Sequence, residues 1–324
     1  MDKVKSKTTD GETTRPTRPQ DSTSFNIIKC SDGYPATSMA TSLPKQPLQH
    51  RSRQPSEDKR SVASTPKDNG WQMKLNNIGR SLRWLGIANP KALKSIDYNY
   101  VTATLSFAPS KISGINVCHR QEYCESTCLY WQGRGRMNRI QQARINKTNR
   151  FFDDEEQAAA EISVELWSLK NMITRTPWFQ KRNFKLACRL NCYSDILWEN
   201  KPYDILNGKT IIEAHPFVQF YDYTKWRYKE RDAWTQNNYH LTYSYNGRSD
   251  DIDNCLEVLK AGENVNVVYT KPSFKNYSRR GGPGGPRVKW GYPMLNSEIS
   301  DLRFLDPSPV VLIGCEKGYS HIAV

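Results

Sequence analysis

Three cysteines lie close together in the sequence and have the chemistry of metal ligands. Cys118, Cys124 and Cys128 form a C-x5-C-x3-C run. Thiolates are the soft ligands that zinc and iron–sulfur clusters prefer, so we predict a zinc ion or an iron–sulfur cluster at this run. Candidates for a fourth ligand are His119, His240, Cys188 and Cys192. The alternative is that the three side chains are small buried thiols.

A pair of carboxylates follows a run of strand-forming residues. Asp195 and Glu199 lie four residues apart, just after the apolar stretch 185–192. Two carboxylates that share a site push their pKa values apart, so that one can act as nucleophile or general acid while the other acts as base or orients its partner. We predict that both are catalytic and that Asp195 is the nucleophile or acid. The alternative is that Asp195 caps the following turn.

Further polar side chains lie on the next two predicted strands. Asp222 and Lys225 lie at the end of the run 217–224, and His240 lies in the run 239–245. Active sites of parallel α/β proteins collect at the carboxyl ends of their strands, so these residues complete the candidate catalytic set. A single histidine inside a strand is more often structural, and the cluster is the stronger signal.

A basic segment without acidic residues follows the cysteines. Its cations are Arg134, Arg136, Arg139, Arg144, Lys147 and Arg150. Repulsion along such a row is relieved when phosphates neutralise it, and guanidinium groups suit phosphate oxygens. A solvated helix face would normally interleave glutamate with lysine. We therefore predict that this segment binds nucleic acid.

A second acid-free segment spans 271–292. The residues that we expect to contact nucleic acid there are Arg279, Arg280, Arg287, Lys289 and Trp290. Its RGGPGGP stretch predicts a mobile loop after a strand, with cations for phosphates and aromatic rings on which bases can stack. The segment contains no G-x-G-x-x-G or Walker pattern, which argues against an ATP site.

Composition points to a polyanionic partner. The chain has 324 residues and a formal net charge of +14, and we expect DNA rather than RNA to be the partner. A merely basic surface is the alternative. No apolar run approaches the roughly 20 residues that a membrane span needs. The N-terminus shows no secretory pattern, so we expect a cytoplasmic protein whose cysteines are thiols or metal ligands.

Two regions differ in their patterning. Residues 1–70 are rich in Ser, Thr, Pro and mixed charges, which predicts a disordered arm. Apolar patterning begins near Trp71, and we assign 71–324 to a single α/β domain. Strands are predicted at 101–107, 185–192, 217–224, 239–245, 265–270 and 310–314, and helices at 137–150, 153–173 and 249–262. Asp153 and Ser249 are candidate N-caps, and Gly262 is a candidate C′ residue.

The alternation of strands and helices predicts a mostly parallel sheet, either open and doubly wound or closed into a barrel like a TIM barrel. We favour the barrel-like arrangement. Polar residues just after the strands then gather at one edge of the sheet. Those residues are Asn191, Ser194 and Asp195 after one strand, Asp222, Thr224 and Lys225 after the next, and Ser244 and Asn246 after the third.

The sequence resembles the gene product 88-like family of tailed-bacteriophage proteins. The resemblance runs from about residue 101 to 318 and rests on the cysteine run followed by LYWQGRGRMNRIQQARINKTNRFF, and on SDILWEN, VQFYDYTK, NYHLTYS and DLRFLDP. It implies a phage or prophage origin, which would place the protein in the host cytoplasm, and a barrel-like α/β domain with a cysteine-bound metal. The predicted arrangement of the chain is also similar, more loosely, to that of the phage DNA transglycosylases that insert 7-deazaguanines. This similarity implies a catalytic aspartate and a zinc site. The C-x5-C-x3-C run departs from the C-x-C-x2-C zinc pattern of related transglycosylases.

Three hypotheses follow. The first is an enzyme that acts on DNA or RNA, in its most specific form a base-exchanging transglycosylase with Asp195 as nucleophile or acid. The second keeps the enzyme class and assigns the cysteine run to an iron–sulfur cluster. The third is a phage protein that binds nucleic acid without catalysis, in which Asp195 is structural.

Overall fold

The computed structural model describes residues 70–87, 90–120, 128–131, 133–278 and 288–316. The chain divides into two units, residues 1–63 and 64–324, and all described residues belong to the second. The disordered arm predicted over residues 1–70 therefore lies outside the described residues, apart from Gly70. No helix in the described ranges is both long and apolar enough to cross a membrane.

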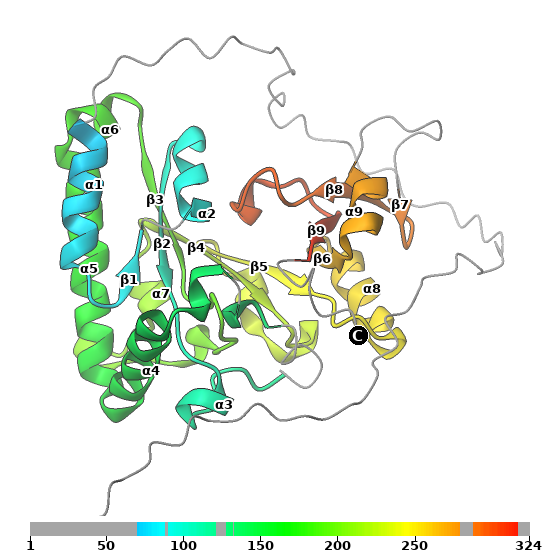
Figure 1. Cartoon of the computed structure of the whole chain (residues 1–324), viewed down its shortest axis with the longest axis horizontal. Coiled ribbons are helices and arrows are strands. Elements are labelled where there is room, and N and C mark those ends of the chain that lie inside the picture. The colour runs from blue at the N-terminus through cyan, green and yellow to red at the C-terminus, as the bar shows by residue number, and fades with distance from the viewer. Residues whose placement is uncertain (1–69, 88–89, 121–127, 132, 279–287, 317–324) are drawn as a thin grey trace, which may run out of the picture. The chain divides into compact units, whose positions relative to one another are not determined.

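A nine-stranded sheet runs through the described residues, in the order β1-β2-β3-β4-β5-β6-β9-β8-β7 (Figure 1). The strands are β1 (Leu85–Gly86), β2 (Tyr100–Leu105), β3 (Lys185–Arg189), β4 (Val218–Thr224), β5 (Tyr239–Ser244), β6 (Asn264–Tyr269), β7 (Val288–Lys289), β8 (Tyr292–Asn296) and β9 (Val311–Cys315). From β2 to β8 all neighbours pair in parallel. The predicted mostly parallel α/β fold is confirmed.

The predicted barrel closure is not confirmed. Within the described residues the sheet is open, because β1 and β7 end it and do not pair with each other. Each is a two-residue strand that pairs antiparallel with its neighbour, so neither edge offers a long parallel ladder for closure. The order is also sequential from β1 to β6, which differs from a doubly wound sheet, where the order reverses at a switch point.

Local sequence signals located the elements well. All six predicted strands are present, as β2 to β6 and β9. The caps differ in detail: the carboxylate of Asp154, rather than that of Asp153, accepts the first-turn N–H bond of α5. The turn Ser249–Asp251 precedes α8, so Ser249 does not cap that helix. Gly262 has a φ of 94° just after α8, as expected of a C′ glycine.

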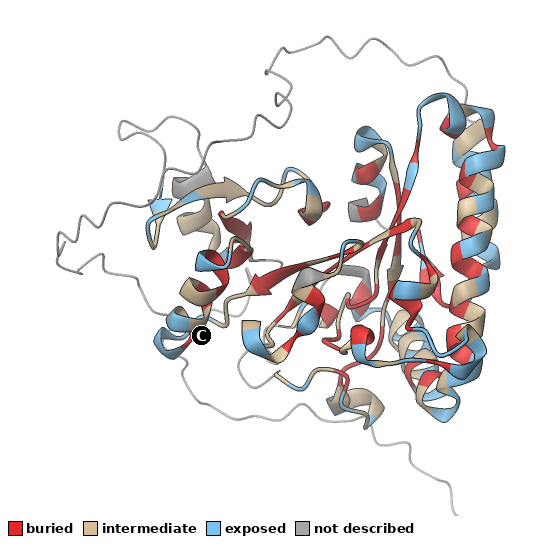
Figure 2. Ribbon diagram, turned by 180° about the vertical axis from the view of Figure 1, so that it is seen from behind, coloured by how far each residue is buried: buried red, intermediate tan, exposed pale blue. Residues whose placement is uncertain are grey.

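The helices of the described residues are α1 (Gly70–Ser81), α2 (Pro90–Leu93), α3 (Ser110–Ser113), α4 (Asn138–Asp153), α5 (Glu155–Arg175), α6 (Pro177–Lys181), α7 (Ile211–Ala214), α8 (Ile252–Lys260) and α9 (Lys271–Ser278). Helices α1, α4, α5, α6 and α7 bury side chains in the core on the first face of the sheet, the face to which Leu186 and Phe220 point. Helix α5 buries one stripe at helical spacing and exposes its other side (Figure 2). The stripe consists of Ala158, Ala159, Ile162, Glu165, Leu166, Leu169 and Ile173.

The second face of the sheet carries polar and aromatic side chains. The connection from β8 to β9 lies against it, with Leu302 and Phe304 packed on Tyr221. Several buried polar atoms on this face and on the connection have no hydrogen-bond partner among the described residues. They belong to Thr102, Arg189, Tyr221, Asn264, Asn266, Arg303 and Asp306. Buried atoms of this kind are commonly satisfied by ordered water, so the second face is a polar layer and the first face is the apolar core.

The carboxylate of Glu165 joins α5 to the start of the sheet. Its oxygens accept the backbone N–H groups of Arg83, Trp84 and Leu85 at 2.5 to 3.2 Å. Glu165 is 9% exposed, so water cannot readily replace these bonds. A buried donor that loses its acceptor costs free energy, and Glu165 therefore fixes β1 at the edge of the sheet.

We predict that Glu165→Ala lowers the free energy of unfolding by about 3 kcal/mol, because three backbone N–H groups lose a charged acceptor. Glu165→Gln keeps one oxygen and should lose less. Urea unfolding measures both, with Val164→Ala as the control, since Val164 is 65% exposed on the same helix. Equal stability of Glu165→Ala and the control would contradict the assignment.

Candidate functional site

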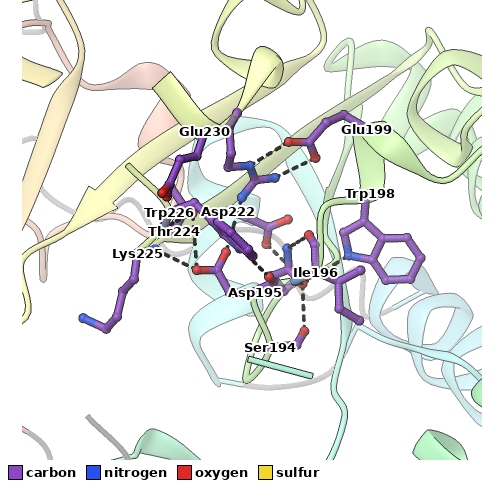
Figure 3. A network of polar contacts seen from close by, with 12 residues as sticks. Ser194, Asp195, Ile196, Trp198, Glu199, Asp222, Thr224, Lys225, Trp226 and Glu230 are labelled. Atoms are coloured by element: carbon purple, nitrogen blue, oxygen red, sulfur yellow. Dashed lines mark hydrogen bonds and ion pairs between the residues drawn. The ribbon is translucent and has the colours of Figure 1, made fainter. Parts of the chain in front are cut away.

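The polar residues predicted after β3 and at the end of β4 meet at the carboxyl ends of these strands (Figure 3). The backbone N–H of Asn191 donates to Asp222 Oδ1 at 2.8 Å. The Asn191 side chain in turn accepts from Ser194 Oγ and from the indole of Trp198 at 2.8 and 3.1 Å. Parallel strands bring their carboxyl ends to one edge, and these bonds join the loop after β3 to the end of β4.

Arg231, which the sequence analysis did not single out, holds the two predicted catalytic carboxylates. Its Nε and Nη2 donate to the two oxygens of Glu199 at 2.7 and 2.8 Å, and its Nη1 lies 3.3 Å from Asp195 Oδ1. The side chains of Arg231, Glu199 and Asp195 are 0%, 1% and 4% exposed. Asp195 and Glu199 do not share a helix face. They converge because both bind one guanidinium.

Asp195 also holds the chain just after β4. Its Oδ2 accepts the backbone N–H of Lys225 at 2.7 Å and the hydroxyl of Thr224 at 3.3 Å. Burial raises the pKa of Asp195, and Arg231 opposes this rise. The Lys225 side chain extends away from the carboxylates (Figure 3), and its Nζ donates to the Ser244 carbonyl oxygen at 3.0 Å.

Asp222 lies inside the protein with 0% exposure. Its Oδ2 accepts the hydroxyl of Tyr239 at 3.1 Å, and Arg189 Nε lies 3.9 Å from Oδ1. Burial raises the pKa of Asp222 to about 7, and Arg189 limits the rise. Asp222 can therefore hold or release a proton near neutral pH.

The chain around Cys118, the first of the three cysteines, is fixed to this same edge of the sheet. The carbonyl of Val117 accepts the backbone N–H of Asp195 at 2.8 Å. Arg120 Nη2 forms an ion pair with Glu230 at 2.5 Å, and its guanidinium lies 5.1 Å from the Trp226 ring centroid. The His119 ring contacts the same indole at 5.9 Å. Residues just before and after Cys118 are thus anchored to the carboxyl ends of β3 and β4.

Two of the three predicted metal ligands lie among the described residues. Cys118 and Cys128 are half-buried, and Cys124 lies outside the described residues. Within the described ranges, no three His, Cys, Asp or Glu side chains are close enough to hold a metal ion. The four candidate fourth ligands are therefore not gathered around Cys118 and Cys128. Thiols near a polar edge fit a soft metal in type, and the cysteines are the residues that would hold it.

The remaining predicted site residues lie elsewhere on the sheet. His240 points to the second face, where burial and Arg303 lower its pKa to about 4, so it is neutral at pH 7. Cys188 is fully buried in the core, and burial raises the pKa of its thiol well above the usual value. These positions suit structural roles better than metal binding.

Three cations of the first basic segment are engaged with other groups of the protein, and two of them, Arg144 and Lys147, are partly buried. The Arg144 guanidinium lies 5.0 and 4.3 Å from the ring centroids of Tyr130 and Tyr193. Lys147 donates to the Trp84 carbonyl, and burial lowers its pKa to about 8. Arg150 forms an ion pair with Glu161 and lies over the Trp84 ring.

Other residues of that segment remain exposed. Arg136 and Arg139 are exposed, and Arg136 Nε donates to the Trp131 carbonyl at 3.0 Å. The side chain of Arg134 lies outside the described part of the chain. The helix predicted over 137–150 is α4, as expected. The basic segment therefore has two parts. Arg144, Lys147 and Arg150 fix α4 to neighbouring segments, whereas Arg136 and Arg139, near the N-terminus of α4, are exposed.

The second basic segment is only partly a loop. Lys271–Ser278 forms α9, with a proline in its first turn, where a missing N–H costs nothing. Arg279, Arg280 and Arg287 lie outside the described residues. Lys289 Nζ lies 4.7 Å from the Trp290 ring centroid, and Trp290 packs against Tyr245 after β5 at 5.4 Å.

A pocket of about 180 Å³ opens at the ends of β4 and β5, and one of its lining residues, Lys225, donates its backbone N–H to the carboxylate of Asp195. It is lined by Arg120, Lys225, Arg227, Tyr243, Asn246, Asp250, Asp251 and Asn254. A larger pocket of about 640 Å³ lies at the opposite edge, against the starts of β3 to β5, among residues such as Lys185, Phe217 and Asn238. The smaller pocket is the better candidate site, because ligands of parallel α/β sheets bind outside the carboxyl ends of the strands.

Fold and site together define an α/β protein with an open, mostly parallel sheet and a charged site at the strand carboxyl ends. The family model for gene product 88 matches residues 74–323, and the chain belongs to the gene product 88 family. No curated protein and no solved structure matches the chain.

The raised pKa of Asp222 gives a pH-dependent prediction. Between about pH 4 and 7 the folded protein keeps a proton on Asp222 that the unfolded chain releases, so this group's contribution to stability falls as the pH rises. The Asp222→Asn variant lacks this titration. The difference in free energy of unfolding, wild type minus variant, should fall by up to roughly 4 kcal/mol from pH 4 to 8. Urea unfolding at each pH measures it, and a constant difference would contradict the assignment.

Proposed function

We propose that the protein is an enzyme that acts on nucleic acid, with its site at the carboxyl ends of β4 and β5. The observation that carries the proposal is the anchoring of the chain around Cys118 at this edge, near the buried carboxylates of Asp195 and Glu199 and a pocket lined by three cations and two aspartates. Ion pairs that only stabilise a fold have no need of a neighbouring pocket, so the pocket favours a binding or catalytic role for these carboxylates. Burial raises the pKa values of Asp195 and Asp222, and buried carboxylates with raised pKa values are typical of catalytic sites. The net charge of +14 supports a polyanionic substrate, with DNA as the first candidate.

In its most specific form the proposed reaction is base exchange in DNA. A carboxylate would attack C1′ of the deoxyribose and displace guanine, which takes up a proton. The N9 atom of a 7-deazaguanine, which gives up a proton, would then form the new bond to C1′ and displace the carboxylate. Asp195 is the candidate nucleophile, because its Oδ2 bonds the backbone of Lys225, which lines the pocket. Arg231 would keep Asp195 ionised. If the protein is phage-encoded, the reaction takes place in the host cytoplasm.

The second candidate is an enzyme with an iron–sulfur cluster at Cys118, Cys124 and Cys128. Its support is the thiolate chemistry of these cysteines and the bonds that fix the chain around Cys118, after β2 and α3, to the carboxyl ends of β3 and β4. Cys118, Cys124 and Cys128 would hold the cluster, which would supply one-electron chemistry at this edge of the sheet. Metal analysis after anaerobic purification decides between the metals, since a colourless protein with zinc and no iron would exclude the cluster.

Nucleoside mass spectrometry tests the proposed function. DNA from cells that make the protein, with 7-deazaguanine precursors supplied, should contain an altered nucleoside. Asp195→Asn should abolish it, because the nucleophile is lost, while the Lys229→Gln variant should retain it, since Lys229 is 82% exposed. Only standard nucleosides with the wild-type protein would eliminate base exchange. Salt-dependent nucleic-acid binding without any altered nucleoside would then support a non-catalytic binding protein.

A further inference from the structure

We propose that the pocket at the ends of β4 and β5 binds a single nucleotide, with the phosphate against Arg120, Lys225 and Arg227 and the sugar against Asp251. The inference rests on the proposed function only in choosing a nucleotide over other phosphate esters. It assigns the substrate-holding role to residues that no sequence motif identified.

One wall of the pocket is positively charged and therefore favours an anionic ligand. Within the described residues, neither Lys225 nor Arg227 forms an ion pair. Lys225 Nζ donates to the carbonyl oxygen and the hydroxyl of Ser244 at 3.0 and 3.4 Å. Two cations without carboxylate partners repel each other across a small pocket, and a phosphate between them would remove that repulsion.

The third cation is held in place before any ligand arrives. Arg120 is fixed by Glu230 at 2.5 Å and by the Trp226 ring at 5.1 Å. Glu230 Oε2 also accepts the backbone N–H of Arg227 at 2.9 Å. One carboxylate therefore positions both arginines of this wall. A preorganised wall loses less entropy when it binds a ligand.

The opposite wall has different chemistry. Asp251 is buried, and its oxygens accept the Tyr243 hydroxyl at 2.5 Å and the backbone N–H of Asn246 and the amide of Asn254 at 2.9 Å. A carboxylate fixed in this way is an acceptor with lone pairs left over. It suits the hydroxyl groups of a sugar and repels a second phosphate. Asp250 lies at the rim, where Arg248 neutralises it at 3.0 Å.

The volume limits what the pocket encloses. At about 180 Å³ it is smaller than the roughly 300 Å³ of pockets that surround a whole drug-sized ligand. A phosphate with its sugar is the portion of a nucleotide that such a pocket encloses, and the base then extends outside it. The phosphate can come from a nucleic-acid chain or from a free nucleotide, and both present the same group.

Binding measurements on the full chain test the proposal. Titration calorimetry with deoxyguanosine monophosphate, deoxyguanosine and a single-stranded DNA oligonucleotide separates the sources of the phosphate. A phosphate-bearing ligand should bind at least about tenfold more tightly than the nucleoside. The Arg227→Gln variant should weaken that binding at least about tenfold, because one charge-assisted contact is lost.

A matched control removes the same charge nearby. Lys229 lies two residues from Arg227, is 82% exposed and pairs with Glu257 outside the pocket, so Lys229→Gln should bind as the wild type does. Lys225→Gln provides a second test from a different loop position, and thermal unfolding confirms that each variant is folded.

The outcomes separate the two proposals. Mononucleotide binding that depends on Arg227 supports a free nucleotide, and oligonucleotide binding alone with that dependence supports a phosphate in a chain. Oligonucleotide binding that is unchanged in both Arg227→Gln and Lys225→Gln overturns the pocket assignment and leaves the proposed function standing. Absence of binding by every phosphate ligand overturns both.

Discussion

The guanidinium of Arg231 lies wholly inside the protein, between the carboxylates of Glu199 and Asp195. Burying three charged groups is costly unless each is paired and hydrogen-bonded, and here the donors and acceptors match. Because Arg231 occupies Oδ1 of Asp195, Oδ2 of that residue is available to bind the backbone of Lys225. The direction of the Lys225 side chain, and with it one wall of the pocket, depends on this buried charge cluster.

The parallel sheet makes this convergence possible. Loops after β3, β4 and β5 leave the same edge, so side chains that are far apart in sequence meet there (Figures 1 and 3). The chain around Cys118 is bonded to the same edge through Val117 and Arg120. The first face supplies an apolar core beneath the site, and the second face supplies a polar layer. A site of this kind needs only the edge of a sheet, and barrel closure is not required for it.

Much of the fold could be predicted from sequence, because apolar runs and turn residues are local signals. The convergence of Asn191, Asp222 and Asp195 could also be predicted from the sequence, because the carboxyl ends of parallel strands lie at the same edge of a sheet. The pairing of Arg231 with two carboxylates did not, because it joins residues more than 30 apart and leaves no local pattern. The anchored cations of α4 were likewise hidden, since their partners, such as the ring of Tyr193, lie on other segments.

Hydrogen–deuterium exchange of the full chain, with and without a single-stranded DNA oligonucleotide, tests most directly whether the carboxyl edge is the substrate site. We expect slower exchange on DNA binding in the peptides over 225–231 and 246–254, which line or border the smaller pocket. Peptides over 216–219 and 236–238, at the opposite edge of the sheet, should exchange at unchanged rates. Protection confined to the opposite edge, with none at 225–231, would contradict the assignment of the substrate site to the carboxyl edge.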